Sequence, residues 1–103
     1  AATELDARLV AIKSGALIEH ADGLFRGKDY LAAAAEYERI LVECPEFEHY
    51  GLAMFNAAVA YEMAQDFAAA LQLYERVAKG YAGTELAADA LKRTVLVRES
   101  TGL

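Results

Sequence analysis

Histidine and cysteine are the residue types in this chain best suited to catalysis or metal binding, and they occur only at His20, His49 and Cys44. His20 stands two residues before Asp22, and His49 lies in a turn rich in acidic residues. None of the three has the HExxH or Cys/His spacing of a metal site, and Cys44 has no candidate triad. We therefore expect a partly buried His20 with a satisfied ring, a solvated His49 and a Cys44 that only ends a helix. No catalytic, metal-binding or cofactor-binding residue is predicted, and the protein is not expected to be an enzyme.

The glycines and the charge balance argue against further classes of function. Gly23 and Gly27 lie in or just after a predicted helix rather than after a strand, so they do not form a phosphate-binding loop. The net charge of −6 argues against nucleic acid as a partner, because phosphates attract clustered Lys and Arg. No stretch reaches the roughly 18 apolar residues of a membrane span, so no membrane insertion is expected. The single cysteine excludes an internal disulfide.

The chain contains an internal repeat. Residues 29–40 read DYLAAAAEYERI and residues 66–77 read DFAAALQLYERV, so the copies align without a gap at an offset of 37 (66 − 29). A copy at a period of about 20–50 residues is typical of repeat architectures, in which each unit packs against its neighbours. Glu38 and Glu75, each followed by Arg, are expected to be solvated charges on the outer face.

Five helices are predicted, over residues 3–26, 30–43, 47–64, 67–81 and 84–99. The chain is 56% hydrophobic with a single proline, which favours helices. Thr3 is expected to cap the first helix, where Leu9 and Ile12 belong to an apolar stripe at helical spacing. Ser14-Gly15 could kink or break this helix, but the stripe resumes at Leu17, which favours one long helix. Short turns between amphipathic helices make neighbours antiparallel, so we expect an all-α fold.

Turn residues separate the predicted helices. Gly27 is suited to closing the first helix and Asp29 to capping the second. Pro45 cannot continue a helix and restricts Cys44 before it, so the second helix is expected to end there. Residues 65–66 form the next predicted turn.

The two copies resemble the tetratricopeptide repeat (TPR) family, whose helix–turn–helix unit of about 34 residues carries the pattern W-x2-L-G-x2-Y…A-x3-F…P. Ala33-x3-Tyr37 followed by Pro45 fits the second half of this pattern, and Ala70-x3-Tyr74 repeats it. The resemblance implies an α-α superhelix (a TPR-like solenoid) of about five antiparallel helices. The longer period and the segment YAGTELAADA at residues 81–90 look like the repeats of bacterial cell-envelope TPR proteins.

The resemblance implies a single TPR-like domain over residues 1–103. An extra N-terminal helix, 3–13, is expected to run on into the first helix of repeat one, 14–50. Repeat two covers 51–87, and a terminal helix covers 84–99. In each of the two repeats a second helix follows the first, and the terminal helix is expected to lack this second helix.

In the TPR family the first helices of successive pairs line a concave groove that takes a peptide or a partner helix. Carried over position by position, the groove consists of Ile18, Asp22, Phe25, Phe55, Asn56, Val59, Met63, Lys92, Arg93 and Leu96. Asn56 stands where an asparagine often holds the backbone of a bound peptide, and Arg93 where a cation contacts a ligand carboxylate. Ile18 and Asp22 replace the Lys and Asn of the family's carboxylate clamp, which favours an apolar or mixed-charge ligand.

The resemblance thus implies a non-catalytic protein–protein interaction module. The apolar residues of the groove set also fit ordinary packing, and this reading stays open. An alternative function is structural: Leu91, Val95 and Leu96 lack a following helix, and a second copy covering them would give a homodimer or an extended stack. The identity of the partner stays open, as does the compartment, whether a bacterial periplasm or envelope or the cytoplasm.

Overall fold

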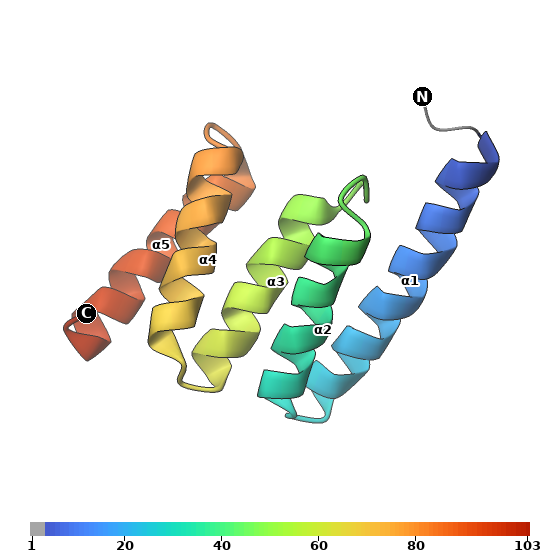
Figure 1. Ribbon diagram of the computed structural model, residues 1–103. Coiled ribbons are helices and arrows are strands. Elements are labelled where there is room, and N and C mark those ends of the chain that lie inside the picture. Colours follow the sequence, from blue (N-terminus) through green and yellow to red (C-terminus); the bar gives the residue numbers. More distant parts are fainter. Residues whose placement is uncertain (1–3) are drawn as a thin grey trace.

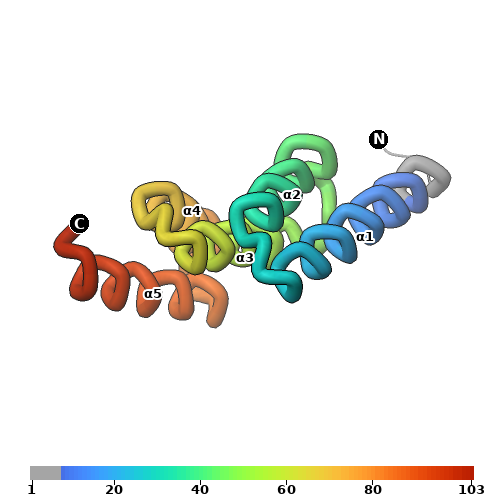
Figure 2. The backbone as a smooth tube through the Cα atoms, turned by 90° about the horizontal axis from the view of Figure 1, so that it is seen from below, coloured from blue at the N-terminus to red at the C-terminus, as the bar shows by residue number. Residues whose placement is uncertain are grey.

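The computed structural model describes residues 4–103, and every regular element within them is a helix. These helices are α1 (Glu4–Arg26), α2 (Tyr30–Glu43), α3 (Tyr50–Met63), α4 (Phe67–Gly80) and α5 (Glu85–Thr101). Consecutive helices pack side by side, and α3 also contacts α5 (Figure 1). In Figure 2, α2 and α4 lie on one side of the stack, and α1, α3 and α5 lie on the other. The expected all-α fold of antiparallel helices is confirmed.

The turn between α1 and α2 and the turn between α3 and α4 share one backbone geometry. Lys28 and Gln65, which stand 37 residues apart, have positive φ angles of 64° and 66°. In both turns the amide of the following aspartate donates to the carbonyl oxygen five residues earlier, at 2.9 Å. A left-handed residue with this bond is a common way to end a helix, and glycine usually occupies it. Gly27, expected to close α1, is therefore not the left-handed residue; Lys28 is.

The first helix is continuous through Ser14 and Gly15. Ser14 is fully buried, and its Oγ donates to the carbonyl oxygen of Val10 at 2.7 Å. This bond satisfies the hydroxyl within its own helix, so a buried serine does not force a break. The prediction of one long helix is confirmed.

The N-terminal part of α1 extends past the end of α2. Lys13 Nζ lies 2.8 Å from Glu43 Oε1, on the last residue of α2. Upstream of this contact Leu9 and Ile12 are exposed, so their apolar stripe does not pack against another described helix. Thr3, the expected cap, lies outside the described residues.

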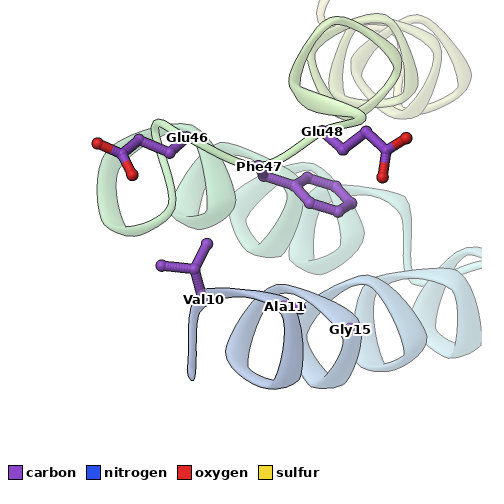
Figure 3. A pocket seen from close by; sticks show the side chains of 6 residues that line it. All are labelled: Val10, Ala11, Gly15, Glu46, Phe47 and Glu48. Carbon is purple, nitrogen blue, oxygen red and sulfur yellow. The ribbon is translucent and has the colours of Figure 1, made fainter. Parts of the chain in front are cut away.

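The third helix begins at Tyr50, so the predicted start at Phe47 is wrong. After Pro45 the chain makes turns instead: Phe47 N donates to Cys44 O at 3.0 Å, and Tyr50 N donates to Phe47 O at 3.1 Å. The ring of Phe47 lies over α1 near Gly15, beside a surface hollow of about 260 Å³ (Figure 3). The glutamates on either side of Phe47 point away from each other in this view.

Small residues make the contacts between paired helices. Four alanines of the two repeats are fully buried: Ala21, Ala33, Ala58 and Ala70. Because alanine adds only a methyl group, the helices can approach closely there. Tyr37 and Tyr74 are also buried, as the reading of two stacked hairpins requires.

The remaining ends differ little from the predicted ones. Thr84 caps α5, its Oγ1 accepting from Ala87 N at 3.2 Å, and Gly102 closes it at φ 77°. One close approach links α3 to the end of α4: a Cβ added at Gly51 would lie 2.5 Å from Cζ of Tyr81. Glycine is required here because any side chain would collide with that ring.

Two glutamates expected to be merely solvated instead bridge to another helix. Glu38 accepts a hydrogen bond from Tyr61 Oη at 3.1 Å, from α2 to α3. Glu75 lies 3.0 Å from Arg98 Nη2, from α4 to α5.

Among the helices in residues 4–103, none is both long enough and apolar enough to cross a bilayer.

Candidate functional site

A small hollow lies where α1, α2 and α3 meet. It is lined by Phe25 of α1, Tyr37 of α2, and Asn56 and Val59 of α3, and its volume is about 130 Å³. Asn56 and Val59 share a helix face because they are three residues apart. Pockets that enclose whole small molecules start near 300 Å³, so this hollow has room for about one side chain. The structure thus brings together three of the residues expected in the groove.

Asn56 is the polar group of this hollow. Its side chain is partly buried, and its amide makes no hydrogen bond to any other described residue. A side-chain amide offers both donors and an acceptor, the pair of groups that a peptide backbone needs. Asn56 is therefore free to hold the backbone of a bound segment whose side chain enters the hollow.

The hydroxyl of Tyr37, beside the hollow, is already used. It donates a short hydrogen bond to Asp22 Oδ1 across the α1–α2 contact. Burial raises the pKa of Tyr37 well above its usual value, and the bond to the Asp22 carboxylate raises it further. Asp22 therefore fixes the wall of the hollow.

A second carboxylate joins three helices. Glu62 Oε1 of α3 accepts from Tyr74 Oη of α4 at 2.8 Å and from Arg93 Nε of α5 at 3.1 Å. Burial first, and then the bond to Glu62, raise the pKa of Tyr74. The same carboxylate raises the pKa of Arg93. Arg93, expected to meet a ligand carboxylate, pairs here with Glu62, so any role toward a ligand stays a prediction.

The other apolar members of the expected groove differ in their surroundings. Phe55 packs edge-on against Tyr74, with ring centroids 5.5 Å apart. Ile18 is partly buried and packs against the core. Met63 is about half exposed at the last residue of α3. Phe55 and Ile18 thus take part in packing, as the alternative reading allowed, while their contact with a ligand stays a prediction.

Lys92 and Leu96 line a different hollow. They lie with Leu91, Val95 and Glu99 around an open surface depression of about 550 Å³ on α5. No residue of this set lines the hollow at α1–α3. Of the ten expected groove residues, three therefore line the hollow at α1–α3, two line this depression, and the other five line neither.

The contributions of two residues to this region were not predicted from the sequence. Tyr37 was singled out only as part of the repeat pattern, yet it lines the hollow. Glu62 stands at a groove position by the same resemblance, yet its carboxylate accepts hydrogen bonds from both Tyr74 and Arg93. A signal existed for both, because a buried tyrosine hydroxyl needs a partner and each carboxylate lies on the preceding helix.

The histidines and the cysteine carry no site. His20 Nδ1 lies 2.9 Å from Glu36 Oε2, but its side chain is 64% exposed, so the expectation of partial burial is wrong. His49 is exposed, as expected, and it precedes α3 instead of lying within it. Cys44 is buried at the end of α2. Among the described residues, no three His, Cys, Asp or Glu side chains are grouped to hold a metal ion.

Comparison of the chain with protein-family models, curated proteins and solved structures gives no match. The resemblance to the TPR family therefore rests on the sequence pattern and stays a prediction. The 37-residue repetition of turn geometry and the hollow with its unpaired amide are independent of that resemblance.

Proposed function

We propose that this protein is a non-catalytic, TPR-like interaction module that binds a peptide or a partner helix on the face formed by α1 and α3. The observation that carries the proposal is Asn56, whose unpaired amide lines a hollow sized for one side chain. A polar group beside an apolar depression on rigid helices is a usual arrangement for recognition of a peptide.

The ligand chemistry follows from the lining. Phe25 and Val59 favour an apolar side chain in the hollow, while Asn56 pairs with the backbone beside it. Asp22 and Glu62 already accept hydrogen bonds from tyrosines, so neither is an open site for a cation. An apolar segment of the partner is therefore favoured over a charged terminus.

Selection of short random peptides displayed on phage tests this proposal. The folded chain serves as bait, with counter-selection on the Asn56→Ala variant. Isothermal titration calorimetry of the enriched peptides should show about tenfold weaker binding to Asn56→Ala, because one hydrogen bond to the backbone is lost.

Gln72→Ala is the matched control, since it also removes a side-chain amide from a helix, here an exposed amide on α4. It should leave the affinity unchanged. If no peptide is enriched, or if both variants bind the enriched peptides as well as wild type does, the proposed groove function is wrong.

A further inference from the structure

The outward face of α5 is apolar and uncovered. Leu91, Val95 and Leu96 are 56%, 54% and 52% exposed. Lys92 and Glu99 complete the rim of the open depression that these side chains form. Three large apolar side chains side by side, with charges at the edge, are typical of an interface.

The repeat shows what this face corresponds to. Leu91 and Val95 stand 37 residues after Met54 and Ala58 of α3, which are buried in the core. Lys92 and Leu96 stand 37 residues after Phe55 and Val59, which are only partly buried. On α1 the residues equivalent to Met54 and Ala58, Leu17 and Ala21, are likewise buried. Leu91 and Val95 are thus exposed at repeat positions that are buried in both hairpins.

Val95 lies at the centre of this face, and its size favours a more widely spaced partner over a helix placed like α2 or α4. A helix placed like α2 or α4 needs a small residue at this point, and Ala58 and its equivalent Ala21 supply one. Val95 adds two methyl groups there and keeps such a helix from approaching as closely. The face therefore fits a more widely spaced partner better than a third copy of the α3–α4 contact.

The charges at the rim point to a symmetric partner. Lys92 and Glu99 are seven residues apart, so they lie about 10 Å apart along the same side of α5. Neither makes an ion pair with another described residue. When two such helices pair antiparallel about a two-fold axis that passes between Val95 and Leu96, each Lys92 faces Glu99 of the partner subunit, and the symmetry forms this pair twice.

We propose that a second copy of this chain covers this face, with the two α5 helices antiparallel. Lys92 then faces Glu99 of the partner subunit, and Val95 faces Leu96 of the partner subunit across the axis. This arrangement buries the exposed apolar side chains and forms two ion pairs between Lys92 and Glu99, one on each side of the two-fold axis. It does not involve the hollow at Asn56 and is independent of the groove function.

The association is expected to be weak, since a few side chains on one helix cover less area than the standard interface of about 800 Å² per partner. We expect a dissociation constant on the order of 100 μM. Sedimentation equilibrium across that concentration range measures it. About 0.15 M salt screens the long-range repulsion between copies that each carry a charge of −6.

Two matched variants locate the interface. Val95→Glu places a charge at the centre of the face and should abolish the dimer. Val42→Glu makes the same change at an exposed valine on α2 and should leave the dissociation constant unchanged. Circular dichroism confirms that both variants stay helical.

A charge exchange tests the arrangement itself. Lys92→Glu or Glu99→Lys alone places like charges opposite each other twice and should weaken the dimer about tenfold or more. The double variant Lys92→Glu/Glu99→Lys restores both pairs and the net charge of wild type, and should restore the dissociation constant. A chain that stays monomeric, a dimer indifferent to Val95→Glu, or a double variant no better than the single ones overturns the proposal.

Discussion

Substitution of Glu62 is the most informative single test of what stabilises this fold, because the Glu62 carboxylate links α3, α4 and α5. Replacing it by alanine leaves the hydroxyl of Tyr74 without its acceptor and Arg93 without its partner. The two losses differ in size, since Tyr74 is completely buried while the Arg93 side chain is 41% exposed.

The magnitude follows from these exposures. A buried hydroxyl left unpaired costs about 1–3 kcal/mol. An ion pair with one solvated partner contributes about 0.2–1 kcal/mol. Alanine returns a few tenths of a kcal/mol through its helix propensity. We expect Glu62→Ala to lower the free energy of unfolding by about 2 kcal/mol, which corresponds to about 8–16 °C in Tm for a domain of this size.

The assay is urea unfolding followed by circular dichroism at a helix band, with a thermal melt as a second measurement. Glu75→Ala is the matched control, because Glu75 also pairs with an arginine of α5 but both side chains are about half exposed. Its cost should stay below about 0.5 kcal/mol.

A double-mutant cycle with Tyr74→Phe separates the tyrosine bond from the arginine pair. In that background Glu62→Ala should cost at least about 1 kcal/mol less than in wild type, because the shared bond is already gone. Equal losses for Glu62→Ala and Glu75→Ala, or the absence of coupling to Tyr74, would refute the assignment of Glu62 as the link between the helices.

The two remaining predictions concern helix glycines and alkaline pH. Gly15→Ala should stabilise the protein by about 0.5–1 kcal/mol, since nothing lies within 4 Å of an added Cβ, while Gly51→Ala should destabilise it by about 1–3 kcal/mol through collision with Tyr81. Urea midpoints that move the same way in both variants would contradict this. Tyr37 and Tyr74 have pKa values raised by burial, so the stability that they contribute is present below about pH 10 and is lost as the pH rises toward the folded-state values. Absorbance of tyrosinate should show these two ionising last, together with unfolding; if all six tyrosines ionise in one step while the helices remain, the reasoning is wrong.

Much of the helical arrangement could be predicted because it depends on local chemistry. The copies at residues 29–40 and 66–77 carry the same small and aromatic residues in helical register, and their turns share one backbone geometry. The residue that adopts the left-handed conformation could not be predicted, because Lys28 and Gln65 take a place that glycine usually fills. The start of α3 was missed because Phe47 packs over α1 instead of extending the helix.

The candidate site, like the fold, could be predicted from the sequence only in part. The sequence pattern singled out Phe25, Asn56 and Val59, which do line one hollow. It also placed Lys92 and Leu96 beside them, and these lie on the separate face of α5. Spacing along a chain fixes which side chains share a helix face, but the positions of the helices relative to one another decide which faces meet.

By itself the sequence determined the helices, the 37-residue repeat and the buried alanines and tyrosines, because these follow from periodicity and side-chain size within a few turns of chain. Only the tertiary structure decided the partners of the polar groups. There Tyr37 donates to Asp22, and Tyr74 and Arg93 donate to Glu62. The side-chain amide of Asn56 has no partner within the described part of the chain. The physical reason is range: a hydrogen bond forms only within about 3 Å, and residues far apart in the chain reach that distance only after the helices have packed.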